Sequence, residues 1–388
     1  MPVLTMGAHA LLSPSSAHRW LNCTPSPKLE AREPDSSSSY AEEGTLAHAF
    51  CARELKFYLG LPTNHEAKEI RELFDKYYTA EMDEHVQTYR TVVLEKFEKA
   101  RQTTPDPRLL VETRLDFGNY IPDAFGTADA VIIADGMMEI IDFKYGKGVR
   151  VEAERNPQMM IYALGAYDEF SLEYDIKQVR MTIVQPRLQN ISEYTMSVYD
   201  LMAWAENTLK PTAMKAYNGE GEQKPGDWCR FCKVRGKCKA LAEDCISTAS
   251  MFSDPRLITP EMMASEVLPR LASIKSWVTD VEEYALQRAL DGEKFKGYKV
   301  VEGRSNRKIT DAQGVLKVLS GEYDTEALMK PRELKTITDL ERIIGKKRFA
   351  ELCSDYITKP QGKPTLVPES DKRPPFNSAE DDFRGINL

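Results

Sequence analysis

The stretch "GTADAVIIADGMMEIIDFKYG" (residues 126–146) decides the fold, because two apolar runs flank the pair Asp135-Gly136. An Asp-Gly pair between two strand-like runs is a strong signal for a β-hairpin. Asp142 and Lys144 interrupt the second run, two residues apart. Because side chains alternate along a strand, these two should project the same way, while Phe143 points to the opposite side and into the core.

The segments around this hairpin indicate a mixed α/β core. Helical and strand-like patterns follow in this order: helices over about 42–60 and 82–100, a strand over 108–117, the hairpin, a helix over 156–170, a strand over 179–188 and a helix over 198–218. This order predicts a central mixed sheet flanked by helices, with a helical N-terminal part.

The chain has 388 residues, 42% of them hydrophobic and 29% charged, which is typical of a globular protein. At roughly 150 residues per domain, this length suggests two or three domains. We expect a domain over residues 1–250, closed by four cysteines, and a helical and basic α+β extension over 251–356. Residues 357–388 are rich in proline and charge, so we expect a flexible tail there.

The formal net charge of −8 means that nucleic acid would have to contact a local basic patch. No run approaches the ~18 apolar residues of a membrane helix, and the first residues lack the pattern of a signal peptide. We therefore expect a cytoplasmic protein with no membrane partner. In a reducing compartment, clustered cysteines more often bind a metal or act in catalysis than form disulfides.

Carboxylates gather around the hairpin. Asp129, in its first strand, should lie near Asp142 across the pair, and Glu112 in the preceding strand could reach the same end of the sheet. Such carboxylates are costly in an apolar sheet unless cations offset them. Lys144 offsets one, and Mg²⁺ or Mn²⁺ would offset the rest and suit phosphodiester hydrolysis. Taken alone, Asp142 and Lys144 could also be an ordinary ion pair at a sheet edge.

The order of motifs resembles the RecB-like branch of the PD-(D/E)XK nuclease superfamily. The motifs are spread over about 45–166 and read, in chain order, Gly44 to His48, Glu112, Gly126 to Asp129, Asp142 to Lys144, and Gln158 to Tyr162. Each motif is weak alone, but their order and spacing together are specific. The cysteines extend the resemblance to about residue 240.

This resemblance implies a restriction-endonuclease-like fold and a metal-dependent deoxyribonuclease. Asp129, Asp142 and His48 would be metal ligands, and Lys144 would be the catalytic lysine. Gln158 and Tyr162 would contact DNA or brace the site, and Glu112 would complete the catalytic set. Many members have Glu where this chain has Asp142. Without that context, His48 on an amphipathic helix reads as an ordinary surface or core residue.

Three cysteines lie close together as C-x2-C-x5-C: Cys229, Cys232 and Cys238. Thiolates select zinc or iron–sulfur clusters, and a local zinc site would take Cys245 as the fourth ligand. The resemblance extends to members with an AddB-type [4Fe–4S] cluster, which implies Cys23 as the fourth ligand instead. Unligated thiols are the third alternative. Cys51 and Cys353 lie in helical patterns and should be buried apolar residues.

The segment "GEKFKGYKVVEGRSNRK" (residues 292–308) is strongly basic and contains Tyr298. Its cations, among them Lys299, Arg304, Arg307 and Lys308, suit a DNA backbone. A solvated strand pair would explain them equally. No G-x-x-x-x-G-K-[ST] loop is present, so a cooperating helicase would be a separate polypeptide.

Together these observations predict a DNA nuclease. The resemblance favours an exonuclease that acts on single- or double-stranded ends in replication, recombination or repair, working beside a helicase or a single-strand-binding protein. By this resemblance the protein is similar to stand-alone exonucleases, including those of phages. A phage-encoded protein of this kind would act in the host cytoplasm. The alternatives are a non-catalytic DNA-binding or scaffold subunit with the same fold, and a zinc-bearing interaction protein.

Overall fold

The structure, a computed structural model, describes residues 10–34, 39–63, 68–250, 259–304, 307–330, 333–358, 360, 362, 364–368 and 373–376. The chain separates into two compact units, Met1–Ile274 and Lys275–Leu388. The boundary falls within the helix α11 (Leu268–Leu290), downstream of residue 250, where the sequence had suggested a domain end.

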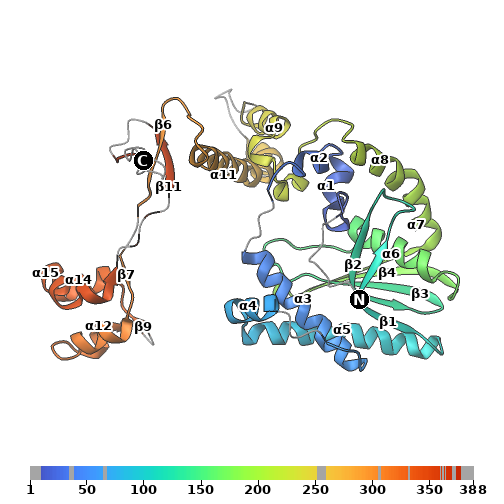
Figure 1. Cartoon of the computed structure of the whole chain (residues 1–388), viewed down its shortest axis with the longest axis horizontal. Helices are drawn as coiled ribbons and strands as arrows, with labels where there is room; N and C mark the ends of the chain where they lie inside the picture. Colours follow the sequence, from blue (N-terminus) through green and yellow to red (C-terminus); the bar gives the residue numbers. More distant parts are fainter. Residues whose placement is uncertain are drawn as a thin grey trace, which may run out of the picture. The chain divides into compact units, whose positions relative to one another are not determined.

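A five-stranded sheet forms the centre of the first unit (Figure 1). Its strands lie in chain order: β1 (Arg108–Asp116), β2 (Phe125–Ile133), β3 (Gly136–Phe143), β4 (Ile176–Gln185) and β5 (Asn190–Ser197). All neighbours are antiparallel except β3 and β4, which are parallel. A parallel pair needs a crossover, and α6 (Pro157–Phe170) lies in this one. The hairpin and the mixed sheet predicted from the sequence are confirmed.

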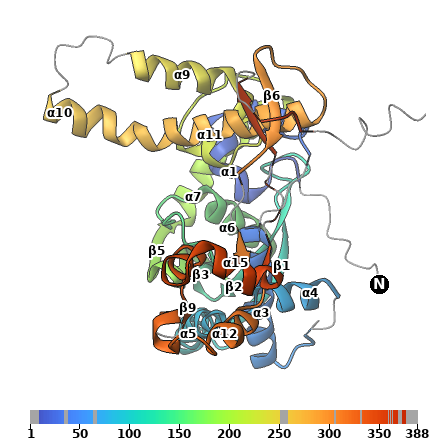
Figure 2. The ribbon, with the colours of Figure 1, turned by 90° about the vertical axis from the view of Figure 1, so that its left-hand side faces the viewer.

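Helices cover both faces of this sheet, as the views in Figures 1 and 2 show. One face packs against α6, α7 (Val198–Trp204) and α8 (Lys210–Asn218), and the other against α3 (Ser39–Tyr58) and α5 (Ala80–Thr103). In β2, Val131 and Ile133 face the first group, whereas Ala130 and Ile132 face the second. A strand buried on both faces reads as a continuous apolar run, which explains the sequence of this hairpin.

Side-chain caps fix where α6, which carries Gln158, and α5 begin. The side chain of Asn156 accepts hydrogen bonds from the backbone N–H groups of Gln158 and Met159, and Pro157 occupies the first turn of α6. Thr79 caps α5 in the same way, through the N–H of Met82. Shorter helices complete this unit: α1 (Ala17–Asn22), α2 (Ser26–Glu30), α4 (Lys68–Tyr77), α9 (Lys239–Ser250) and α10 (Pro260–Met262).

The second unit has its own small apolar core, which includes Val315, Leu340 and Phe349. Its helices are α12 (Ala312–Leu319), α13 (Thr325–Leu328), α14 (Ile337–Ile344) and α15 (Lys346–Cys353). Its strands are β6 (Tyr298–Glu302), β7 (Lys308–Ile309), β8 (Met329–Lys330), β9 (Glu333–Leu334), β10 (Ile357–Thr358) and β11 (Pro364–Pro368).

The tail expected to be flexible is paired in part. β11 lies antiparallel beside β6 (Figure 2), and β10 pairs with β7. Main-chain hydrogen bonds to these strands supply the order that the composition of residues 357–368 does not predict. Residues 377–388 lie outside the described residues.

No helix in the described part of the chain has both the length and the apolar character that crossing a membrane requires.

Candidate metal centre

Glu112 and Asp129 lie where β1 and β2 both change the sheet face that they present. The flanking pairs are Val111 with Ala130 and Thr113 with Ala128. Val111 and Ala130 pack towards α3 and α5, whereas Ala128 packs towards α6. Glu112 has a φ of 52°, in the left-handed region that a bulky residue rarely adopts. Strain of this kind persists mainly at functional sites, where the surrounding structure holds it in place.

His48 joins these two carboxylates from α3. The ligand atoms of His48, Glu112 and Asp129 all lie within 4.8 Å of one another. His48 Nδ1 is 3.0 Å from Asp129 Oδ1, and its ring packs edge-on against Phe143, with the ring centroids 5.4 Å apart. The N–H of Phe143 donates to Asp129 Oδ2 at 2.7 Å, so one carboxylate links β2, β3 and α3.

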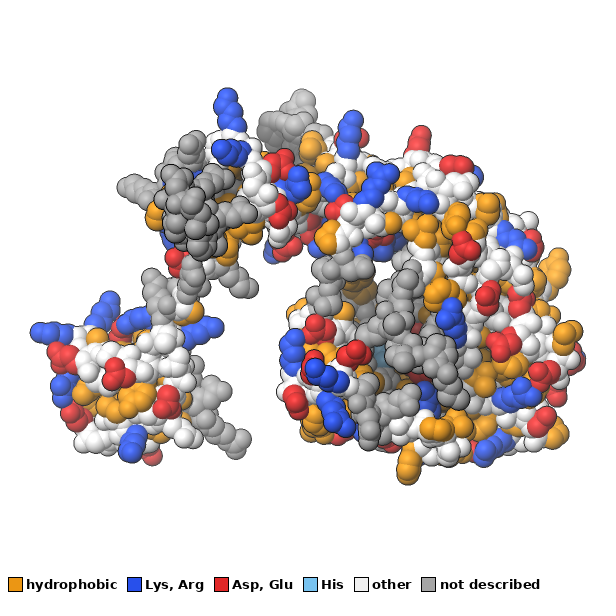
Figure 3. All heavy atoms as spheres, viewed as in Figure 1, with side chains coloured by type: hydrophobic (Ala, Val, Ile, Leu, Met, Phe, Trp, Pro, Cys, Tyr) orange, Lys and Arg blue, Asp and Glu red, His pale blue; other side chains and the backbone are white. Residues whose placement is uncertain are grey.

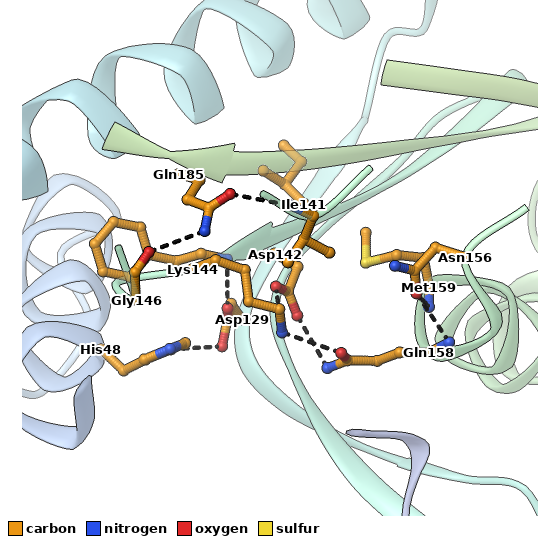
Figure 4. Close-up of polar contacts among 12 residues, drawn as sticks. His48, Asp129, Ile141, Asp142, Lys144, Gly146, Asn156, Gln158, Met159 and Gln185 are labelled. Atoms are coloured by element: carbon orange, nitrogen blue, oxygen red, sulfur yellow. Dashed lines mark hydrogen bonds and ion pairs between the residues drawn. The ribbon is translucent and has the colours of Figure 1, made fainter. Parts of the chain in front are cut away.

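Asp142, Lys144 and Gln158 form a second group beside the first (Figure 4). Lys144 Nζ lies 2.9 Å from Asp142 Oδ2 and donates to Gln158 Oε1 at 3.0 Å. Gln158 Nε2 donates to Asp142 Oδ1 at 3.1 Å. Asp142 and Lys144 therefore project together, and Phe143 is fully buried on the opposite face, as the sequence predicts.

The structure brings the predicted site residues together, but the three that could share one metal ion are not the three predicted. Ala130 opposes Ile141, which brings Asp129 and Asp142 close, as expected for a hairpin. Asp142 is outside the triad of His48, Glu112 and Asp129, and Glu112 is inside it. Apart from Lys144, Asp142 Oδ2 has no polar partner in the described part of the chain, so it remains able to bind a cation.

Burial and charge shift the pKa of each group at this centre. Burial lowers the pKa of His48, but the charge and hydrogen bond of Asp129 outweigh it and raise this pKa to about 9. Burial, reinforced by the charge of Asp129, raises the pKa of Glu112 to about 7. Burial also raises the pKa of Asp142, although Lys144 opposes the shift. Three buried or half-buried carboxylates with one histidine are a donor set that suits a divalent cation.

Tyr162 packs beside the strand that carries Asp129. Its side chain is largely buried, and its ring lies 5.9 Å from that of Phe117, measured between centroids. A Cβ added at Gly126 would come within 3.1 Å of the Tyr162 ring, which explains the glycine that precedes Asp129 in the motif. Of the two roles suggested by the resemblance, bracing is the one that this burial favours for Tyr162.

Gln185, which the sequence analysis did not single out, supports the loop after Lys144 (Figure 4). Its amide nitrogen donates to the carbonyls of Gly146 and Val149, at 2.9 and 2.7 Å, and its oxygen accepts from the N–H of Val151. The available signal was a glutamine at the end of an apolar strand. Gln185 is fully buried there, and a buried polar side chain needs hydrogen-bond partners.

A hollow opens beside the triad. Its walls include His48, Glu112 and Asp129, together with Ala52, Arg53 and Lys56 of α3. Both carboxylates and the histidine are therefore reachable from one open space.

Four cysteines line one small pocket between the N-terminal segment and the segment after α8: Cys23, Cys229, Cys232 and Cys238. Glu30 joins the two segments, because its carboxylate accepts from Arg19 Nε at 2.8 Å and from the N–H of Lys233 at 2.9 Å. Ser26 Oγ also lines the pocket, and it is buried without a polar partner in the described part of the chain. Cys245 is buried in α9, outside this lining.

Burial disfavours the thiolate form of three cysteines in this pocket. Burial raises the pKa of Cys23 and Cys229 above the usual range and that of Cys232 to about 12. Among the described residues, no three cysteine sulfurs lie within 4.8 Å of one another. Cys51 and Cys353 are buried in apolar clusters, as predicted.

The basic segment lies in the second unit. Lys299 is in β6, Lys308 begins β7, and Arg304 is exposed between these strands. Arg307 pairs with Glu341 of α14, so part of the expected DNA-binding charge is engaged within this unit. This pairing was not visible in the sequence because Glu341 lies 34 residues away.

A buried ion network on the sheet was not predicted from the sequence. Lys96 of α5 contacts Glu139 of β3 and lies 2.5 Å from Glu193 of β5. Thr182 donates to the same Glu139 carboxylate at 3.0 Å. Glu139 inside the run "MMEII" was the available signal, because a carboxylate in a buried strand needs a partner.

A crystal structure described as "Crystal structure of SSO0001" is 13% identical to this chain, with a TM-score of 0.26, over 58% of this chain and 96% of that one. A family model described as "Protein of unknown function (DUF2800)" matches residues 9–374. Because this match spans most of the sequence, the chain belongs to the DUF2800 family.

Proposed function

We propose that this protein is a metal-dependent DNA nuclease with a PD-(D/E)XK core of the RecB-like type. The observation that carries the proposal is the convergence of His48, Glu112 and Asp129 beside the linked group of Asp142, Lys144 and Gln158. A structural ion pair needs one cation and one anion. This centre instead collects three carboxylates, one histidine and a lysine, and His48, Glu112 and Asp129 among them line a hollow.

Each residue has a role that follows from its contacts. His48, Glu112 and Asp129 would hold Mg²⁺ or Mn²⁺, with Asp142 next to them. Such a cation would stabilise charge on a phosphoryl oxygen and lower the pKa of a bound water. Lys144 stays cationic, because the charge of Asp142 outweighs burial and raises its pKa. Gln158 fixes the Lys144 ammonium, which can then position the attacking water or stabilise the phosphate.

We further propose that the four-cysteine pocket holds a [4Fe–4S] cluster. Four thiolates could hold either zinc or a cluster, and the resemblance to AddB-type members is what favours the cluster. Cys23 is favoured over Cys245 as the fourth ligand because only Cys23 lines the pocket. The cluster would join the N-terminal segment to the nuclease core.

Action on DNA ends, and cooperation with a separate helicase or single-strand-binding protein in the cytoplasm of a bacterial or phage-infected cell, are the finer parts of this proposal. They rest on the resemblance of the motif order to stand-alone RecB-like exonucleases.

The deciding experiment uses purified protein, Mg²⁺ or Mn²⁺, and end-labelled single- and double-stranded DNA. We expect metal-dependent cleavage by the wild type, loss of cleavage in Lys144→Ala, and no change in Lys177→Ala. Lys177 is the matched control because it is exposed and pairs with Asp175, away from the centre. DNA binding without cleavage in either metal would favour a scaffold subunit, and zinc without iron in the purified protein would favour an interaction protein.

A further inference from the structure

Lys56 is a cation that the proposed catalytic roles leave unused. It lies in the last turn of α3 and lines the same hollow as His48, Glu112 and Asp129. Eight residues separate it from His48, which corresponds to about 12 Å along a helix axis. That distance is too great for Lys56 to act on the bond that the metal centre would cleave.

The charges around Lys56 set it apart from its neighbour Arg53. Arg53 is already engaged, because its guanidinium pairs with Glu54 at 2.9 Å and lies 4.8 Å from the centre of the Phe50 ring. Lys56 makes no ion pair with any residue in the described part of the chain, although its charge lowers the pKa of Glu112. Figure 3 shows Lys and Arg side chains, with Asp and Glu among them, over the surface formed by α3 and α4.

We propose that Lys56 is a phosphate-binding subsite of the hollow, which holds a backbone phosphate of the DNA strand next to the one at the metal centre. This inference rests on the proposed function and adds to it the path of the substrate along α3. A half-buried lysine that makes no ion pair among the described residues, in the hollow beside the proposed metal centre, is suited to bind a diester anion. An ammonium is a suitable ligand here because it attracts phosphate as a point charge.

Binding and cleavage can be separated by working in the Lys144→Ala background with Mg²⁺. The affinity of a fluorescent single-stranded oligonucleotide is measured by anisotropy over a series of salt concentrations. Each lost phosphate contact lowers the slope of log affinity against log salt by about 0.7 for a single strand. We expect Lys56→Ala to weaken binding about 3- to 10-fold and to lower the slope by this amount, and Lys56→Arg to retain both.

Lys215→Ala is the matched control. Lys215 also lies in the last turn of a helix, α8, and is exposed outside the hollow, so its removal costs the same charge and the same helix-end interaction. It should leave the affinity and slope unchanged. An unchanged slope in Lys56→Ala, with cleavage by the wild type intact, would overturn the subsite and leave the nuclease proposal standing. A protein that neither binds nor cleaves the oligonucleotide would overturn both.

Discussion

Glu112 and Asp129 oppose one another at the point where β1 and β2 exchange the faces that they present, and His48 closes the group from α3. Glu112 reaches this position with a positive φ, and burial together with Asp129 raises its pKa to about 7. The chain thus holds two unfavourable features at one residue. A bound cation would offset the carboxylate charge, whereas the strained torsion of Glu112 would remain.

Glu112→Gly should make the metal-free protein more stable and the metal site weaker. Glycine adopts positive φ without strain, and its introduction removes a carboxylate that is costly to ionise. After the added chain entropy of glycine is subtracted, we expect a gain of about 1 kcal/mol in the free energy of unfolding at pH 8. Urea denaturation in a chelator measures the stability, and titration calorimetry with Mn²⁺ measures the affinity. A destabilised variant with normal metal affinity would contradict this account.

Gln158→Met should reduce cleavage while leaving metal affinity almost unchanged. The substitution keeps the side-chain volume but removes the hydrogen bonds to Lys144 and Asp142. Loss of a group that orients a catalytic residue typically costs about 10- to 100-fold in activity. The rate is measured on end-labelled DNA at saturating Mn²⁺. Full activity in this variant would show that Lys144 needs no brace.

Metal binding should release a proton at neutral pH. The pKa of about 9 at His48 means that the ring is protonated at pH 7.5 in the metal-free protein, and a metal must displace that proton. The apparent affinity should therefore rise with pH until about pH 9 and then level off. Calorimetry in two buffers of different ionisation enthalpy counts the protons. Equal proton release at pH 7.5 and at pH 10 would exclude His48 as the ligand that loses it.

Lys96→Met should destabilise the protein strongly. It leaves the buried Glu139 carboxylate without its ammonium partner, which typically costs about 3–5 kcal/mol. Adding Glu139→Leu should recover most of this loss, since the uncompensated charge is then gone. Lys68→Met, which breaks an exposed pair with Glu72, should change the free energy of unfolding by less than about 0.5 kcal/mol. Equal effects of the two lysine substitutions would contradict the role of burial.

Cys23→Ser and Cys245→Ser should differ in iron content. Cys23 lines the cysteine pocket and Cys245 does not, so only the first substitution should abolish the absorbance and iron of an anaerobic preparation. Retention of iron in Cys23→Ser, with loss of iron in Cys245→Ser, would show that Cys245 and not Cys23 is the fourth ligand. Zinc in place of iron in the wild type would overturn the cluster altogether.

The sequence predicts this fold well where pattern and chemistry agree. Asp135-Gly136 and the apolar runs on either side of it predict the hairpin. The alternation of side chains along a strand predicts the observed faces of Asp142, Phe143 and Lys144. Local rules suffice at these positions because each depends on neighbours within the hairpin.

Long-range relationships were beyond such rules. The face change at Glu112 depends on a single backbone torsion, which no residue pattern announces for a glutamate. Glu139 and Lys96 meet across 43 residues, and Arg307 and Glu341 across 34, so neither pair appears in a local window. The triad contains Glu112 in place of Asp142, which instead contacts Lys144 and Gln158.

The cysteine pocket has a consequence for the order in which the protein is made. One wall comes from residues 19–29 and the other from residues 223–241, so the first wall leaves the ribosome long before the second. Until Cys238 has been synthesised the four-cysteine set is incomplete, whereas the core around the fully buried Trp20 needs residues only to about 217. Closing the pocket is therefore a late step in the synthesis of the first unit, because it requires residues up to about 241 of a unit that ends at Ile274.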